Sequence, residues 1–201
     1  MTGIASAAIT ELAELHPRLV FRTELGNRHM QPQFLRGRQC EVSLTRRVSD
    51  LCEPDMEEQP LFHERLLVVA GADNPLARRR KSVLRDLADA SWVLAPHEAE
   101  AGGPVFEGFR DAGFAMPQVS ILSYSLSLRY SLLLKGPYVT CIPASVMRFG
   151  PKLGFIKVLP IELPPWQQPT VMMTLKDRSR SPAAEAFMDR IRSLSVQMNS
   201  G

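Results

Sequence analysis

The chain has 201 residues, of which 45% are hydrophobic and 22% charged, with 24 basic residues against 21 acidic ones and a net charge of +3. This composition is typical of one globular domain or two small lobes, and the charge is too small and too evenly spread to indicate a nucleic-acid-binding domain. The first residues lack the basic start of a secretory signal, and no apolar run approaches the roughly 20 residues that a membrane helix needs.

The first part of the chain alternates between helix and strand patterns. Ala5–Leu15 has an apolar stripe at helical spacing, and Leu19–Leu25 alternates between apolar and charged side chains, which predicts a strand. Arg28–Arg36 is predicted as a second helix that ends at Gly37, and Val42–Thr45 as a short strand. This order predicts a parallel α/β sheet.

The next segment is predicted to run from a surface loop into a long buried strand. Glu53–Glu58 is acidic and contains a proline, so we expect a loop, whereas Leu61–Ala70 is apolar enough to be a strand buried on both faces. Asn74-Pro75 indicates a turn, and Val83–Leu87 a helical turn. The basic run Arg78–Lys81 lies between them and is interpreted as a solvated loop, not as a DNA contact.

The rest of the chain repeats the alternation of strands and helices. Strands are expected at Trp92–Leu94, Val119–Leu122, Tyr138–Ile142, Phe155–Leu159 and Thr170–Leu175. Helices are expected at Pro104–Asp111, at Ser123–Lys135 and from Ser181-Pro182 onward. The apolar face of the last helix is predicted to be Ala183, Phe187, Ile191, Leu194 and Met198. Pro160–Pro169 is interpreted as a connector.

The sequence lacks the motifs of an enzyme or a metal site. Its four histidines are scattered, and it has neither a glycine-rich phosphate loop nor a nucleophile elbow. His97-Glu98 follows a predicted strand and is interpreted as a solvated loop rather than a catalytic pair. We therefore expect no enzymatic activity, no metal and no cofactor.

Three cysteines form an odd set without paired spacing: Cys40, Cys52 and Cys141. Such a set predicts reduced, buried or half-buried thiols. Together with the missing membrane helix, it indicates a cytoplasmic protein without a membrane partner.

Small polar residues and helix starts follow several of the predicted strands. In open parallel sheets, ligands bind beyond the carboxyl ends of the strands, and helix N-termini there favour anions. We predict a site for a small anionic or polar molecule, formed by Thr2, Ser6, Asn27, Thr45, Arg46, Ala95, Pro96, Ser123, Ser125, Pro143 and Ala144. The guanidinium of Arg46 would bind a carboxylate or phosphate. For each position alone, the alternative is a helix cap, a turn or a solvated side chain.

Several segments, in order, resemble the effector domains of LysR-type transcriptional regulators. Leu15–Phe21 is similar to their helix-to-strand junction, Leu35–Leu44 to the stretch L-x-x-G-x-L-D-L-A-I, and Pro60–Val69 to P-L-x-x-D-x-L-x-L-V. Asn74–Ala77 followed by Leu84–Leu87 resembles the pair H-P-L-A and L-x-D-L.

The resemblance continues to the C-terminus, with two departures. Gly136–Pro143 is similar to the run G-x-G-I-x-x-x-P, and Phe187–Ile191 to the final helix. Cys40-Glu41 stands where Leu-Asp is usual, and Pro137 replaces the second glycine of the later run. The resemblance spans essentially the whole chain.

The resemblance implies a periplasmic-binding-protein type 2 fold, with two Rossmann-like α/β lobes joined by two crossover strands around a central cleft. Lobe one would be residues 1–69 plus 168–201, and lobe two residues 70–167, with Leu66–Ala70 and Thr170–Leu175 as the crossover strands. The family's winged helix-turn-helix and first sheet strand would precede Thr2, and both are expected to be absent here.

The same resemblance implies a sensor that binds a small anionic or polar metabolite in the interlobe cleft to control transcription. It would contact DNA only through the absent N-terminal domain. It would form a homodimer or tetramer through Arg28–Arg36, with Met30, Phe34 and Leu35 at the interface. The alternative for these three residues is the core face of their own lobe.

Two other functions stay open at this point. A solute-binding protein of a transporter has the same fold, and an upstream signal peptide instead of a winged helix would identify it. A small α/β enzyme is the second alternative, and it would require a convergent set of catalytic side chains.

Overall fold

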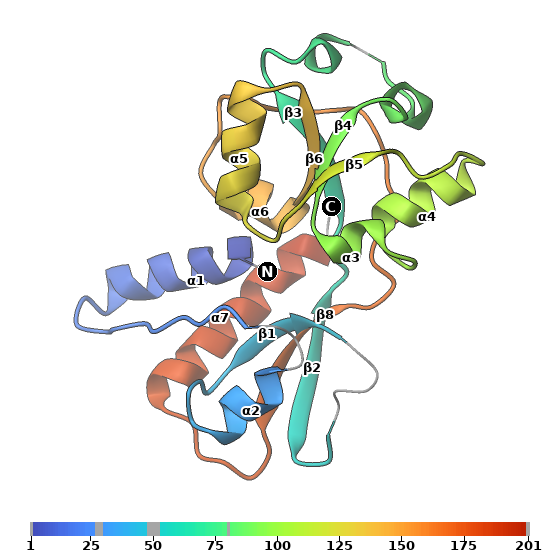
Figure 1. The fold of residues 1–201 in the computed structure, drawn as a ribbon. Helices are drawn as coiled ribbons and strands as arrows, with labels where there is room; N and C mark the ends of the chain where they lie inside the picture. Colours follow the sequence, from blue (N-terminus) through green and yellow to red (C-terminus); the bar gives the residue numbers. More distant parts are fainter. Residues whose placement is uncertain (1, 27–29, 48–52, 80, 200–201) are drawn as a thin grey trace. The chain divides into compact units, whose positions relative to one another are not determined.

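The chain divides into two units, each with its own sheet, and the computed structural model describes residues 2–26, 30–47, 53–79 and 81–199 (Figure 1). The first unit contains residues 1–64, 148–150 and 168–201, and the second contains residues 65–147 and 151–167. The chain leaves the first unit after Glu64 and finally returns to it at Gln168. The first division expected from the sequence lay five residues later, after Val69.

The first unit contains a three-stranded sheet in the order β1-β8-β2. Its strands are β1 (Ser43–Arg46), β2 (Met56–Phe62) and β8 (Thr170–Leu175), and its helices are α1 (Thr2–Leu15), α2 (Gln31–Arg36) and α7 (Pro182–Asn199). The central strand β8 pairs antiparallel with both neighbours, so the prediction of a parallel sheet is wrong for this unit. The alternation of elements in the first part of the chain cannot indicate a central strand that comes from the far end of the sequence.

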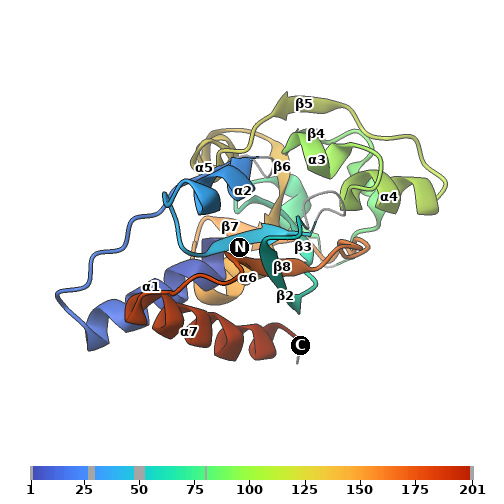
Figure 2. The ribbon, with the colours of Figure 1, turned by 90° about the horizontal axis from the view of Figure 1, so that it is seen from below.

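Helices cover both faces of this sheet, and Figure 2 shows α7 and α2 on opposite sides of β1 and β8. On one side, Met172 of β8 packs with Ile4 of α1 and Ile191 of α7. On the other side, Val171 and Met173 of β8 pack with residues that include Leu35 of α2. The alternating side chains of β8 therefore supply both halves of the core.

The second unit contains a five-stranded mixed sheet in the order β5-β4-β6-β3-β7. The strands are β3 (Leu66–Gly71), β4 (Ser91–Leu94), β5 (Val119–Leu122), β6 (Tyr138–Pro143) and β7 (Ile156–Val158). The helical elements are η3 (Pro75–Arg78), η4 (Leu84–Leu87), α3 (Pro96–Ala99), α4 (Pro104–Asp111), α5 (Leu126–Lys135) and α6 (Ala144–Phe149), of which α6 ends in the first unit. β4 is parallel to β5 and β6, whereas β3 is antiparallel to β6 and β7.

The core of the second unit lies on both faces of its sheet. On the face that α4 covers, Trp92 meets Phe109 edge to face at 6.1 Å between ring centroids, and its Nε1 donates to the carbonyl of Leu87 at 3.0 Å. On the opposite face, Leu133 of α5 packs on Val69 and Ile142. Figure 1 shows α4 and α5 on opposite sides of the sheet. The strands predicted at Trp92–Leu94, Val119–Leu122, Tyr138–Ile142 and Phe155–Leu159 are confirmed, and β4 and β6 are buried between the two layers of helices.

The strand predicted at Leu19–Leu25 is wrong. The segment is irregular and pairs with none of the described strands, and Val20 and Leu25 are 89% and 100% exposed. Alternating side chains produce a strand only where a neighbouring strand bonds to the backbone, and this segment has no such neighbour among the described residues.

The prediction of a loop at Glu53–Glu58 followed by one strand at Leu61–Ala70 is also wrong. β2 begins at Met56, which is 1% exposed. This strand ends at Phe62, and β3 begins at Leu66 in the other sheet. Pro60 fits in β2 because β2 is an edge strand with a register shift at this point. As described, β3 pairs only within the five-stranded sheet and β8 only within the three-stranded sheet, so neither strand joins two sheets.

Most helix predictions are confirmed, with small shifts. The side chain of Asn74 caps η3 and that of Ser125 caps α5, as turn and cap residues do. Gly113, just after α4, has a φ of +75°, a conformation that favours glycine. In α7 the buried side chains include Ala184 and Met188, one position later than the predicted Ala183 and Phe187.

We predict that Ile191→Ala destabilises the protein by about 2–5 kcal/mol, because the substitution leaves a cavity where α7 packs on α1 and β8. Ile191 is fully buried, whereas Val196 on the same helix is 63% exposed. Val196→Ala is the matched control and should change stability by less than about 0.5 kcal/mol. Urea unfolding measures both, and equal losses for the two variants would contradict this packing.

Candidate functional site

The carboxyl ends of three neighbouring strands meet at one edge of the five-stranded sheet. β4 lies between β5 and β6 and runs parallel to both, and the backbone N–H of Ser123 donates to the carbonyl of Leu94 at 2.7 Å. Six of the predicted ligand-binding residues follow these strand ends: Ala95, Pro96, Ser123, Ser125, Pro143 and Ala144. The structure therefore brings this part of the predicted site to one edge.

A buried ion pair lies beneath this edge and links the residues that follow the strands. Glu98 of α3 and Arg129 of α5 are 4% and 2% exposed, and Nη1 of Arg129 lies 3.0 Å from Oε2 and 3.2 Å from Oε1 of Glu98. The backbone N–H of Ala95 also donates to Oε2 of Glu98 at 2.8 Å. Charges are buried at tolerable cost only when they are paired and hydrogen-bonded, as both are here.

The guanidinium of Arg129 also holds the ends of the other two strands. Its Nε and Nη2 donate to the carbonyl of Ser123 at 3.0 and 2.8 Å, and its Nη1 donates to the carbonyl of Cys141 at 3.1 Å. One planar group thus binds Glu98 after β4, Ser123 after β5 and Cys141 in β6, a use that the forked guanidinium allows and an ammonium does not. Arg129 fixes the geometry of the edge, and its guanidinium is bonded to acceptors of the protein itself.

Sequence reasoning missed this pair and interpreted His97-Glu98 as a solvated loop, which is wrong. Residues 96–99 form the one-turn helix α3, and Glu98 faces inward. A usable pattern did exist in the sequence. Arg129 lies three residues after Leu126 and four before the buried Leu133, on the inner stripe of α5, where a charge requires a buried partner.

Three serine hydroxyls lie at the start of α5. Oγ of Ser125 accepts from the backbone N–H of Leu128 at 3.2 Å and lies 2.9 Å from Oγ of Ser127, and Oγ of Ser123 accepts from the N–H of Ser125 at 3.1 Å. Ser125 thus fills the helix-cap role that was the alternative for it. A hydroxyl has one donor and two acceptor positions, so these groups keep capacity for a ligand.

The other four predicted residues at this edge, Ala95, Pro96, Pro143 and Ala144, have no free backbone N–H to donate to a ligand. Pro96 and Pro143 have no N–H. The N–H of Ala95 is bonded to Glu98, and the N–H of Ala144 donates to the carbonyl of Arg65 at 2.8 Å. A ligand at this edge would therefore meet donors mainly from the serines and the first turn of α5.

A stack of three aromatic side chains lies beside the serines, and sequence reasoning missed it. The imidazole of His97 stacks on the ring of Tyr124, with 5.4 Å between centroids and 18° between planes. The imidazole of His97 also meets the indole of Trp166, with 5.4 Å between centroids and 35° between planes. His97 lies three residues after the end of β4 and Tyr124 two residues after the end of β5, so the same strand-end rule that selected the serines would also have selected these rings.

The predicted site residues of the first unit lie on two elements. Thr45 and Arg46 end β1; Thr45 is 2% exposed, with its Oγ1 3.2 Å from the carbonyl of Arg46, whose side chain is half-buried. Thr2 begins α1, and Ser6 donates to the carbonyl of Gly3 within that helix at 2.8 Å. Asn27 lies outside the described residues.

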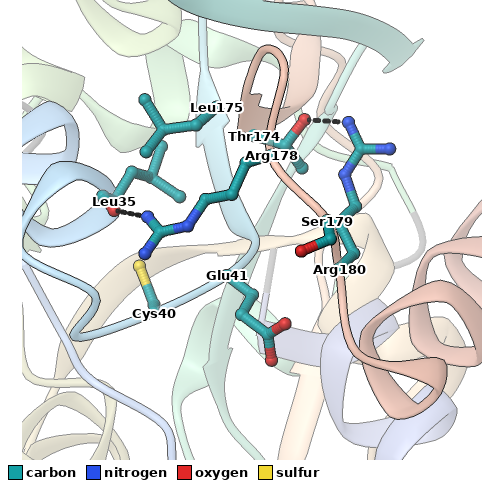
Figure 3. A pocket seen from close by; sticks show the side chains of 8 residues that line it. All are labelled: Leu35, Cys40, Glu41, Thr174, Leu175, Arg178, Ser179 and Arg180. Atoms are coloured by element: carbon teal, nitrogen blue, oxygen red, sulfur yellow. Dashed lines mark hydrogen bonds between the residues drawn. The ribbon is translucent and has the colours of Figure 1, made fainter.

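A separate small pocket opens at the other end of β8 from Thr45 and Arg46, with about 230 Å³ of empty space that includes open solvent (Figure 3). Its lining is Leu35, Cys40, Glu41, Thr174, Leu175, Arg178, Ser179 and Arg180. Arg178 donates to the carbonyl of Leu35 at 2.8 Å and Arg180 to Oγ1 of Thr174 at 2.9 Å, and Figure 3 shows the two side chains diverging. None of the predicted ligand-binding residues lines this pocket.

The three residues predicted at a subunit interface differ in their exposure. Leu35 is 1% exposed and packs with Met56 and Val171, so it belongs to the core of its own unit, which was the alternative. Met30 is 45% exposed and Phe34 is half-buried. The interface stays a prediction for these two residues.

The described residues contain no group of three or more histidine, cysteine, aspartate or glutamate side chains that could hold a metal ion. Within the same part of the chain, none of the helices has the length and apolar character needed to cross a membrane.

We predict that Arg129→Met destabilises the protein by about 3–5 kcal/mol, because it leaves the Glu98 carboxylate buried without its cation. The double variant Arg129→Met/Glu98→Met should recover part of this loss, since it removes both charges. Arg22→Met is the control: its ion pair with Glu24 is 80% and 41% exposed, and its loss should cost less than about 1 kcal/mol. Denaturant unfolding tests the set, and a double variant no more stable than Arg129→Met would contradict the ion-pair interpretation.

We also predict different reactivities for the two described thiols. Burial raises the pKa of the Cys141 thiol well above its usual value. Burial also raises the pKa of the half-buried Cys40 thiol. A raised pKa leaves less thiolate at neutral pH, and the thiolate is the nucleophile. Alkylation followed by peptide mass mapping should label Cys40 slowly and Cys141 only after unfolding; fast labelling of Cys141 in the native protein would contradict its placement.

The chain is similar to known proteins in both sequence and fold. The chain is 26% identical over 192 residues to the transcriptional dual regulator GltC of Bacillus subtilis (strain 168), which covers 94% of this chain and 63% of the relative. It is 24% identical over 188 residues to the HTH-type transcriptional regulator GbpR of Azospirillum brasilense, which covers 93% and 55%. The chain thus spans less than two thirds of the length of these relatives.

Three solved structures resemble it in fold. They are the BenM effector binding domain with its effector benzoate (TM-score 0.68, 20% identity, 98% of this chain and 88% of that one), the reduced OxyR regulatory domain from Pseudomonas aeruginosa (0.70, 21%, 96% and 92%) and the effector binding domain of QuiR in complex with shikimate (0.65, 20%, 96% and 90%). These likenesses confirm the expected fold class, the type 2 periplasmic-binding-like fold.

The chain also matches a sequence family. The match extends over residues 1–195, nearly the whole chain, and the family is described as the LysR substrate binding domain. The chain therefore belongs to the LysR substrate-binding domain family.

Proposed function

We propose that this chain is the effector-sensing domain of a bacterial transcriptional regulator, and that it binds a small anionic or polar metabolite at the carboxyl ends of β4, β5 and β6. The observation that carries the proposal is the edge where Ser123 and Ser125 stand on the buried Glu98–Arg129 pair. The family match and the regulator names of GltC and GbpR support a sensor rather than a transporter's solute-binding protein or an enzyme.

The chemistry of this edge favours a small polar ligand with negative charge. The first turn of α5 carries N–H groups without helical partners, and the partial positive charge of a helix start stabilises an anion. The serine hydroxyls add hydrogen bonds in a fixed geometry, because Arg129 holds the carbonyl of Ser123. A rigid set of donors loses little conformational entropy when a ligand binds.

The proposal includes Thr45 and Arg46 of the first unit, together with Thr2 and Ser6 at the start of α1. The guanidinium of Arg46 would give charge-assisted hydrogen bonds to a carboxylate or phosphate. A ligand that binds one conformation of the chain more tightly than another would shift the population toward that conformation, and this shift would be the regulatory signal.

The biological setting follows from the same proposal. The sensor would work in the cytoplasm as a homodimer or tetramer, with Met30 and Phe34 at the subunit contact. DNA would be bound by a separate winged helix-turn-helix domain of the regulator. The BenM domain with its effector benzoate and the QuiR domain in complex with shikimate indicate the size of ligand to expect.

We predict that a thermal-shift screen of small acids, sugars and aromatic metabolites identifies a stabilising ligand, since a ligand at 100 times its Kd adds about 2.7 kcal/mol to the stability of the folded state. Thr45→Val/Ser125→Ala should stay folded and lose most of this stabilisation. Ser181→Ala is the matched control, because Ser181 also caps a helix, accepting from the N–H of Ala184 at 3.1 Å. Loss of this cap should lower the basal stability by about 1 kcal/mol and leave the ligand effect intact.

Two outcomes would count against the proposal. If the double variant keeps the full stabilisation by the same ligand, the ligand binds elsewhere. If no compound in the screen stabilises the wild-type chain, the sensing role itself is contradicted.

A further inference from the structure

The ring of Tyr124 is the outer member of the aromatic stack at the predicted edge. It is 69% exposed, the imidazole of His97 beneath it is half-buried, and the indole of Trp166 at the base is 6% exposed. The stack thus leads from the core of the second unit to its surface. One face of the Tyr124 ring lies on His97, and most of the ring is open to solvent.

Both rings at the top of the stack are attached to backbone that the buried ion pair fixes. His97 precedes Glu98, whose carboxylate bonds to Arg129, and Tyr124 follows Ser123, whose carbonyl accepts two bonds from the same guanidinium. The Tyr124 ring is therefore held on a rigid base before any ligand arrives. Stacking on such a ring does not require it to be ordered first.

The neighbours of Tyr124 are polar on both sides. Ser123 and Ser125 flank it in sequence, and their hydroxyls are the groups to which we assign the polar part of the ligand. The segment Ser123–Ser125 thus carries an exposed flat π surface and two hydroxyl groups on three consecutive residues. This combination suits a ligand that carries a planar ring and an acidic group on the same small skeleton.

We propose that Tyr124 is a stacking platform and that the ligand of this site is a planar, aromatic or conjugated acid. The inference rests on the proposed function, because it takes the location of the site from it. Aromatic rings stack on one another with a preference over saturated rings of the same size, and the preference expected from such a pair is about twofold to tenfold in affinity.

The test uses two pairs of acids with matched charge and similar size: benzoate with cyclohexanecarboxylate, and cinnamate with 3-cyclohexylpropanoate. Each acid is titrated calorimetrically into the wild-type chain and three variants. Tyr124→Phe keeps the ring, Tyr124→Leu keeps an apolar side chain without it, and Leu128→Ala changes another exposed apolar residue, 44% exposed, near the start of α5.

We expect each planar acid to bind about twofold to tenfold more tightly than its saturated partner in the wild-type, Tyr124→Phe and Leu128→Ala chains. In Tyr124→Leu the preference should disappear. Ring protons of Tyr124 should also shift upfield when a planar acid binds, because a stacked ring shields them, and a merely structural role for Tyr124 would not produce this shift.

Other outcomes would overturn the inference and separate it from the proposed function. Equal affinities within each pair, with binding still lost in Thr45→Val/Ser125→Ala, would leave the site in place and remove the platform. A preference that survives Tyr124→Leu would do the same. If none of the four acids binds up to about 10 mM while a saturated compound from the thermal screen does, the sensor stands and the planar ligand class is wrong.

Discussion

The geometry of the candidate site depends on one buried ion pair, Glu98 with Arg129. Burial of two charges opposes folding unless every polar atom finds a partner, and a well-packed apolar pair could give the same stability. An apolar pair could not, however, bind the N–H of Ala95 and the carbonyls of Ser123 and Cys141. The main effect of the pair is therefore to position the ends of three strands, more than to stabilise the fold. The pairing of β4 with β5 and β6 does not by itself fix the loops that follow these strands.

The edge consequently has two layers with different roles. The inner layer, Glu98 and Arg129, is closed to solvent and saturated with hydrogen bonds, so it cannot exchange partners with a ligand. The outer layer is formed by the serines and Tyr124; Ser125 and Tyr124 are exposed, Ser123 is half-buried, and the hydroxyls retain bonding capacity. A binding surface built in this way can vary its outer side chains without disturbing their support. With a ligand at the proposed site, only the outer layer would need to change for the fold to bind a chemically different molecule.

The sequence predicted the second unit far better than the first. β3, β4 and β6 are short apolar runs, and their burial between α4 and α5 is what such runs indicate. In the first unit the central strand is β8, so Met56 pairs with Leu175 across most of the chain length. No local pattern carries that pairing, and the acidic residues around Met56 therefore predicted a loop. The alternation at Leu19–Leu25 has the local pattern of a strand, and a strand was therefore predicted there. The segment has no partner strand among the described residues, so none forms.

For the site, the rule that ligands bind beyond strand ends placed Ser123 and Ser125 at the same edge as Ala95 and Ala144, which the structure shows, but it said nothing of what supports them. Arg129 was missed because a charged residue within a helix is usually solvated. Arg129 lies on the same stripe of α5 as Leu126 and Leu133, and this stripe faces the sheet. A solvated side chain is therefore not expected at this position. A charge on an inner stripe demands an acidic partner from another element, and Glu98, just past a neighbouring buried strand, is placed to provide one. Such a demand is a long-range constraint readable from sequence, and it points to the same edge as the strand-end rule by an independent physical argument.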